Sequence, residues 1–206
     1  MANDLLDADA IEELGAIIDG MPAILLPVVA DETTGFNAIP DAMAHILSHS
    51  LGIPATAGEI VQINKVGHTR APAFHRLVTP AEFDGHVEVG GSYVLVDDHV
   101  GLGGTLANLK GYLETRGASV LGITTLTESR EARKISLRPA TFAVLWEKHG
   151  QELDDLWQAQ FGHGIDCLTE VEAQNLCRQQ SVAAIEDFLA QAAVEARGRG
   201  LEPAVE

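Results

Sequence analysis

The sequence predicts an α/β fold in which a parallel sheet is flanked by helices and followed by a helical C-terminal extension. Over about the first 130 residues, apolar runs of strand length alternate with segments whose apolar residues recur at helical spacing. This alternation favours a parallel sheet with right-handed crossovers. After Thr127 only helical patterns follow. One apolar run leads directly into two acids and a glycine-rich turn, which is typical of a ligand site.

In the first half of the chain we expect a helix over 8–19, a strand over 23–29, a polar loop over 31–37, a helix over 40–51 and a strand over 60–63. The first helix follows from the spacing of Ile11, Leu14 and Ile18. The second begins at Pro40, a residue favoured at the first helical position. The stretch 64–83 shows no regular pattern and is expected to be a long loop, which in a compact domain is usually functional.

The middle of the chain is expected to contain a strand over 92–97, a helix over 105–116 and a strand over 119–126. Val94, Leu95 and Val96 are apolar on both faces of the first of these strands, as a buried parallel strand requires. Gly117 is a typical residue for ending the helix. These three segments form the best defined strand–helix–strand unit of the sequence.

The C-terminal part is predicted to be helical. Helices are expected over 139–149 and 153–161, with Gly150 between them, and over 169–179 and 181–197. Thr169 and Glu172 have the spacing of a capping box, and Ser181 is a favoured N-cap residue. The predicted division is an α/β core over 1–150, a helical extension or hood over 151–198 and a disordered tail over 199–206.

Composition limits the classes of protein and partner. The chain has 206 residues, of which 46% are hydrophobic, enough for one α/β domain with an appendage. A net charge of −17 and a pI near 4.7 argue against nucleic acid or an anionic membrane as a partner. Two cysteines fit a reducing compartment, and the start lacks a signal-peptide pattern. We therefore expect a cytoplasmic protein.

The most informative segment, 93–105, reads Tyr-Val-Leu-Val-Asp-Asp-His-Val-Gly-Leu-Gly-Gly-Thr. Asp97 and Asp98 are expected at the carboxyl end of the strand, where open α/β sheets bind ligands. The glycines that follow allow a tight turn, and their N–H groups with those of the next helix form an anion site. Acids for ribose hydroxyls beside a nest for phosphate fit a ribose 5-phosphate. The alternative is an ordinary strand–turn–helix with a surface Asp pair.

This segment resembles the signature of type I phosphoribosyltransferases, which bind phosphoribosyl pyrophosphate (PRPP). The resemblance is specific over about 93–126 and looser from about residue 23. It implies a type I phosphoribosyltransferase-like fold and transfer of the 5-phosphoribosyl group from PRPP to a nucleobase-like acceptor, with release of pyrophosphate. It also implies Mg²⁺, held mainly through PRPP oxygens and water. Relatives often form homodimers, which makes a homodimer a candidate here.

The residues that this resemblance assigns to PRPP are Asp97, Asp98, His99, Val100, Gly101, Leu102, Gly103, Gly104 and Thr105. The Asp pair matches the acids that grip the ribose hydroxyls, and 101–105 match the 5-phosphate loop. No residue is assigned as a direct metal ligand. His99 stands where relatives usually have an aliphatic residue, and it either meets the acceptor or is an ordinary hydrogen-bonded histidine. Leu102 replaces the Asp of 6-oxopurine enzymes, which disfavours a hypoxanthine–guanine-type acceptor.

The loop after the first strand occupies the place of the family's pyrophosphate loop. It contains Asp31, Glu32, Thr33, Thr34 and Gly35. The Gly-Phe-Asn at its end has a looser similarity to ComF-like members. The loop carries two acids and no Lys or Arg. This departure favours an alternative function, a PRPP- or nucleotide-binding regulatory protein without turnover.

Three basic residues in the stretch 64–83 are assigned to catalysis: Lys65, Arg70 and Arg76. The family has a mobile loop here that closes over PRPP and excludes water. The alternative is a solvated basic loop that pairs with nearby acids. A third possibility for the whole protein is an assembly role, in which the acidic helical tail binds a basic partner.

Overall fold

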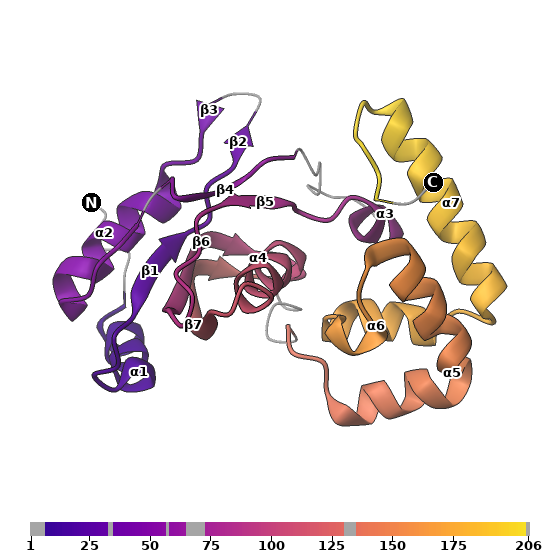
Figure 1. The fold of residues 1–206 in the computed structure, drawn as a ribbon, viewed down its shortest axis with the longest axis horizontal. Helices are drawn as coiled ribbons and strands as arrows, with labels where there is room; N and C mark the ends of the chain where they lie inside the picture. The colour runs from indigo at the N-terminus through magenta and orange to yellow at the C-terminus, as the bar shows by residue number, and fades with distance from the viewer. Residues whose placement is uncertain (1–6, 33–34, 57, 65–72, 130–134, 205–206) are drawn as a thin grey trace. The chain divides into compact units, whose positions relative to one another are not determined.

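The computed structural model describes residues 7–32, 35–56, 58–64, 73–129 and 135–204. The chain forms two compact units, whose elements are labelled in Figure 1. The first unit consists of Met1–Asn64, Ala81–Gly101 and Thr105–Arg130. The second consists of Lys65–Pro80, Leu102–Gly104 and Glu131–Glu206. The predicted boundary at residue 150 stays a prediction, whereas the contacts divide the chain near residue 130.

A three-stranded parallel sheet forms the centre of the first unit, in the order β1 (Ile24–Pro27), β6 (Ser92–Val100), β7 (Ser119–Glu128). Leu25 is in register with Val94, and Val96 with Thr124. In β1 and β6 the apolar runs bury successive side chains on both faces of the sheet, whereas the side chains of the edge strand β7 are at most half-buried. The predicted parallel sheet flanked by helices is confirmed.

Helices cover the two faces of this sheet. On one face lie α1 (Ala8–Ile18) and α2 (Ile39–Leu51), and on the other lies α4 (Gly104–Glu114) (Figure 1). The core of the first face contains Leu14, Ile18, Ala23, Leu25, Met43, Ala44, Leu47, Val94 and Val96. Leu26 and Leu95 alternate to the other face, where α4 buries Leu106, Leu109 and Leu113. The sheet thereby fixes the position of the segment that carries Asp97 and Asp98.

Two short antiparallel pairs complete the first unit. The expected polar loop is in part a hairpin of β2 (Asp31–Glu32) and β3 (Gly35–Phe36). Strand β4 (Ile60–Gln62) pairs with β5 (Phe83–Gly85). The predicted strand over 60–63 corresponds to β4. Its partner β5 and the β2–β3 pair are not evident from the sequence pattern, because backbone hydrogen bonds between such short strands need no long apolar run.

The second unit is helical. It contains α3 (Ala73–Val78), α5 (Pro139–Phe161), the 3₁₀ turn Ile165–Cys167, α6 (Glu170–Cys177) and α7 (Val182–Gly198). The capping box at Thr169 and the N-cap at Ser181 are confirmed, with the Ser181 hydroxyl accepting from the N–H of Ala184. The expectation that 64–83 is wholly irregular is wrong, because α3 buries Leu77 and Val78 among the C-terminal helices.

The core of the second unit is built from α3, α5, α6, α7 and the 3₁₀ turn. Its members are Leu77, Val78, Leu145, Leu153, Trp157, Ile165, Leu168, Ala173, Leu176, Val182, Ile185, Leu189, Ala192, Ala193 and Ala196. Of the predicted disordered tail, 199–204 are described, and the N–H of Ala204 donates to the carbonyl of Val78. The aromatic residues divide between the units: Trp146 and Trp157 lie in the second, Tyr93 and Tyr112 in the first.

None of the helices in the described parts of the chain combines the length and the apolar character that a membrane crossing requires.

Gly150 interrupts α5 with a non-helical backbone at φ 54° and ψ −146°. We expect Gly150→Ala to lower the free energy of unfolding of the second unit by about 1–3 kcal/mol, because a Cβ is strained at positive φ. Urea unfolding followed by tryptophan fluorescence measures this, since both tryptophans lie in that unit. Gly198→Ala is the control, because that glycine has equally open space and no positive φ. Equal effects of the two changes would contradict the strain.

Candidate functional site

Asp97 and Asp98 lie inside strand β6 and not beyond its end. The strand runs to Val100, because β7 continues to Glu128 and stays in register with it: Asp97 with Thr125, His99 with Thr127 and Val100 with Glu128. The predicted strand end at residue 97 is therefore wrong by three residues. The pairing with β7 holds the backbone of the two acids in extended conformation.

Asp97 is a buried carboxyl. The residue is 9% exposed, and its Oδ1 accepts the N–H of Asp98 at 2.9 Å. Burial raises the pKa of Asp97 from 3.8 to about 7; the hydrogen bond from the Asp98 backbone opposes this rise, and the charge of Asp98 adds to it. Asp98 itself is only half-buried. The two acids thus differ in their environment, and a group with a pKa near 7 can both donate and accept hydrogen bonds near neutral pH.

Two residues that the sequence reasoning missed hold the end of β6 in place. The hydroxyl of Thr127 donates to the carbonyl of Asp98 at 3.1 Å, and its oxygen lies 2.9 Å from Nδ1 of His99. Because the Thr127 hydroxyl donates its hydrogen to Asp98, its oxygen is left to accept a hydrogen bond from Nδ1–H of His99. In the neutral tautomer that has its hydrogen on Nδ1, Nε2 is a hydrogen-bond acceptor. The hydroxyl of Ser129 donates to the carbonyl of Gly101 at 2.5 Å. Their position at the end of a strand parallel to β6, with Thr127 inside β7 and Ser129 directly after it, is the signal that could have found them.

The glycine turn belongs to the second unit from Leu102 to Gly104. Gly103 has φ +86°, and a Cβ on it would lie 2.7 Å from Cγ1 of Ile135. Gly103 is therefore required by its backbone and by its packing, independently of any ligand. Helix α4 begins at Gly104, one residue before the predicted start. The N–H groups of its first turn have no partner within the helix, which suits an anion.

The remaining predicted site residues lie elsewhere or outside the described residues. Arg76 lies in α3, half-buried, and burial lowers its pKa. Asp31, Glu32 and Gly35 belong to the β2–β3 hairpin. The residues outside the described part of the chain are Thr33, Thr34, Lys65 and Arg70. The structure therefore brings the Asp pair, His99 and Val100 together on one strand, and the roles of the others stay predictions.

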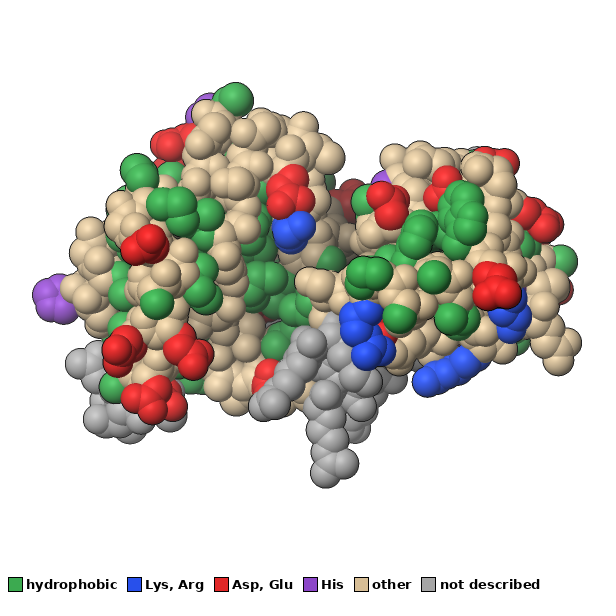
Figure 2. Space-filling view, turned by 90° about the horizontal axis from the view of Figure 1, so that it is seen from below, with side chains coloured by type: hydrophobic (Ala, Val, Ile, Leu, Met, Phe, Trp, Pro, Cys, Tyr) green, Lys and Arg blue, Asp and Glu red, His purple; other side chains and the backbone are tan. Residues whose placement is uncertain are grey.

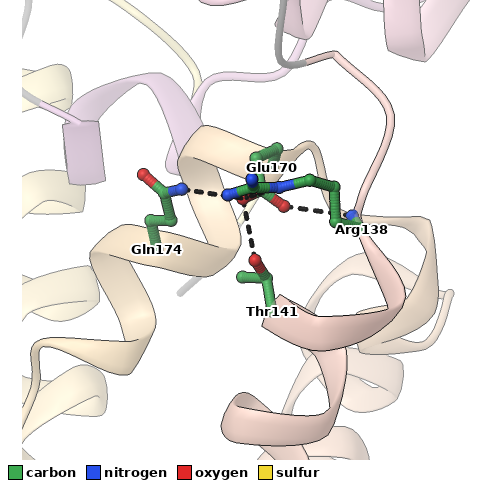
Figure 3. Close-up of polar contacts among 4 residues, drawn as sticks. All are labelled: Arg138, Thr141, Glu170 and Gln174. Atoms are coloured by element: carbon green, nitrogen blue, oxygen red, sulfur yellow. Dashed lines mark hydrogen bonds and ion pairs between the residues drawn. The ribbon is translucent and has the colours of Figure 1, made fainter.

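A fully buried carboxylate, Glu170, organises the start of α6 in the second unit. It accepts hydrogen bonds from the backbone N–H of Arg138 at 3.0 Å, from Nε of Arg138 at 2.8 Å, from the Thr141 hydroxyl at 2.7 Å and from Nε2 of Gln174 at 2.7 Å (Figure 3). Burial acts to raise the pKa of Glu170, but these hydrogen bonds outweigh it and lower the pKa from 4.5 to about 2. The sequence pattern indicated only a helix start here.

The distribution of charged side chains on the surface agrees with the acidic composition of the chain. On the face drawn in Figure 2, acidic side chains are spread over both units, and the basic ones do not merge into one broad patch. Among the described residues, no group of three or more His, Cys, Asp or Glu is arranged to hold a metal ion. Any cation at the Asp pair would therefore need oxygen atoms from a ligand or from water in addition.

Comparison with known proteins identifies two curated relatives. Protein TraN of Escherichia coli is 38% identical over 195 residues, which are 95% of this chain and 43% of TraN. An uncharacterised protein of Haemophilus influenzae is 43% identical over 113 residues, which are 55% of this chain and 25% of that protein. The chain thus spans less than half the length of either relative. No protein-family model matches it.

The solved structures that resemble the chain include phosphoribosyltransferases. An adenine phosphoribosyltransferase from Thermoanaerobacter pseudethanolicus aligns with a TM-score of 0.38 and 23% identity, covering 58% of this chain and 66% of the enzyme. A hypoxanthine phosphoribosyltransferase from Staphylococcus aureus aligns with a TM-score of 0.46 and 17% identity, covering 67% and 70%.

Because burial raises the pKa of Asp97 to about 7, the folded state binds a proton more tightly than the unfolded chain. Its contribution to stability is complete below about pH 4 and is lost as the pH rises toward 7. We expect the stability of Asp97→Asn relative to the unchanged protein to rise by at most about 1.4 kcal/mol per pH unit over that range. Urea unfolding followed by circular dichroism at pH 4 to 8 measures it.

The control for this experiment is Asp84→Asn, which removes an exposed carboxyl from the same unit. The same pH dependence in both variants would mean that the loss of one negative charge, and not burial, is responsible.

The pH dependence expected from Glu170 is opposite in direction to that of Asp97. Its pKa is lowered to about 2, so its stabilising contribution is present above about pH 4.5 and is lost as the pH falls toward 2. We expect Glu170→Gln to destabilise the second unit at pH 7 and the difference from the unchanged protein to shrink below pH 4.5. Tryptophan fluorescence in urea at pH 3 and pH 7 tests this. A difference independent of pH would mean that side-chain shape, and not charge, holds the cluster.

Proposed function

We propose that the chain binds PRPP through residues 97–105 and transfers its 5-phosphoribosyl group to a nucleobase-like nitrogen acceptor, releasing pyrophosphate. The observation that carries the proposal is the succession of three parts along the chain: an acid pair held in β6, a turn with a left-handed Gly103, and the start of α4. Acids suit the ribose hydroxyls, and free N–H groups at a helix start suit the 5-phosphate.

The reaction would place positive charge on the ribose as pyrophosphate departs, so stabilisation of charge and exclusion of water matter more than a covalent nucleophile. Asp98, half-buried, would accept hydrogen bonds from the ribose hydroxyls. Asp97, whose pKa lies near 7, would either accept or donate one. His99 would offer Nε2 toward the acceptor side as a hydrogen-bond acceptor.

Magnesium fits the chemistry of these donors, because adjacent carboxylates and ligand oxygens are the hard ligands that it takes. PRPP oxygens and water would hold it in the main, and Asp97 and Asp98 would contact it through water. When bound, the ion supplies charge screening for the pyrophosphate group. A cytoplasmic location and a homodimer remain parts of this proposal.

A regulatory protein that binds PRPP or a nucleotide without turnover is the second candidate. It is favoured by the acids Asp31 and Glu32 in the segment proposed to face pyrophosphate, where no Lys or Arg occurs. In the transferase, Lys65, Arg70 and Arg76 would provide the missing positive charge. Release of pyrophosphate from PRPP across a panel of nucleobases separates the two candidates.

The binding site itself is tested by calorimetry with PRPP and Mg²⁺. We expect the double change Asp97→Asn and Asp98→Asn to weaken PRPP binding at least tenfold, about 1.4 kcal/mol, because both proposed ribose contacts lose their carboxyl groups. Asp84→Asn is the control of equal charge type in the same unit. An unchanged affinity in a folded double variant would remove the acid pair from the site.

A further inference from the structure

Two side chains of the second unit lie beside the Cα atoms of the glycine turn. An ideal Cβ on Gly103 would lie 2.7 Å from Cγ1 of Ile135, and one on Gly104 would have Oε1 of Glu172 as its nearest neighbour at 3.7 Å. All four residues belong to the same compact unit. The segment that would approach a phosphate is thus packed against an aliphatic side chain and a carboxylate.

The covering residues are held in place by the start of α6. The carbonyl of Ile135 accepts the N–H of Glu170 at 3.4 Å, and three residues later Arg138 is bound to the buried Glu170 carboxylate through its backbone and its guanidinium (Figure 3). Glu170 is fully buried and accepts several hydrogen bonds, including those from the backbone and the guanidinium of Arg138. These bonds anchor the segment around Ile135 to α6.

Glu172 is oriented by the capping box. Its Oε2 accepts the backbone N–H of Thr169 at 2.8 Å, and the N–H of Glu172 donates to the Thr169 hydroxyl at 3.3 Å. This arrangement holds the carboxylate on the side of Gly104. A negative charge on this side of the turn opposes the arrival of a phosphate, since the energy of two like charges varies inversely with their separation.

We propose that Ile135 and Glu172 form an autoinhibitory cover over the glycine turn, which a phosphate-bearing ligand must displace before it occupies the turn. This inference rests on the proposed function, because it regulates the same phosphate site. A cover of this kind couples ligand binding to the start of α6, since the free energy needed to open it is subtracted from the binding free energy.

The contact is tested first without any ligand, by amide hydrogen exchange of the peptide that contains residues 101–106. Ile135→Ala removes the side chain that packs on Gly103, so we expect faster exchange in this peptide. Leu137→Ala is the matched control, because Leu137 is also half-buried in the same segment but packs against the core of the second unit. Equal exchange in the unchanged protein and Ile135→Ala would overturn the cover.

The regulatory role is tested by calorimetry with ribose 5-phosphate. We expect Ile135→Ala and Glu172→Gln each to tighten binding at least about threefold, since one opens the cover and the other removes the opposing charge. A Gln at this position can still cap Thr169. The matched control is Glu186→Gln, an exposed acid of α7 in the same unit. Unchanged or weaker binding in both variants would overturn autoinhibition.

Failure of the proposed function has a different signature. Suppose that neither the unchanged protein nor any variant binds ribose 5-phosphate, while Ile135→Ala speeds exchange at 101–106. The packing contact would then be supported, but the phosphate site and the regulatory role that depends on it would both be wrong. If the unchanged protein binds ribose 5-phosphate and Ile135→Ala does not change the exchange at 101–106, the phosphate site is supported and the proposed cover is wrong.

Discussion

The pairing of β6 with β7 beyond residue 97 is the interaction on which the candidate site depends. Without it, Asp97 and Asp98 would follow a strand end, and their backbone would be free to adopt loop conformations. With it, Thr127 and Ser129 reach the carbonyls of Asp98 and Gly101, and Asp97 is enclosed by the sheet. The same enclosure that fixes the carboxyl also raises its pKa, so its position and its acidity have one cause.

The second unit depends on a different kind of constraint, the burial of a charge. Removing Glu170 from water is unfavourable unless every oxygen is hydrogen-bonded, and here donors from α5, α6 and the segment before α5 meet this need. A charge satisfied in this way permits few alternative arrangements of its donors. The start of α5 and the start of α6 are therefore held in one relative position by a group that the hydrophobic core alone would not specify.

Much of the fold could be predicted from the sequence, because strands buried on both faces and capped helices leave local patterns. Val94–Val96, the Thr169–Glu172 pair and Gly150 are examples. The extent of β6 could not be predicted, because it is set by register with β7. Helix α3 could not either, since its six residues are stabilised by helices more than 60 residues away.

The candidate site divides in the same way. The Asp pair and the glycine turn were evident as a contiguous motif. The contacts of Ile135 and Glu172 with that turn were not, since they depend on long-range packing that leaves no spacing to recognise.

The distribution of aromatic residues has a consequence for following motion in the native protein. Both tyrosines, Tyr93 and Tyr112, lie in the first unit, and both tryptophans, Trp146 and Trp157, lie in the second. Excitation energy absorbed by tyrosine passes to tryptophan with an efficiency that falls steeply as the two separate. The unlabelled chain therefore contains an energy donor in one unit and an acceptor in the other. A change in sensitised tryptophan emission on adding a ligand would report a change in the separation of the units.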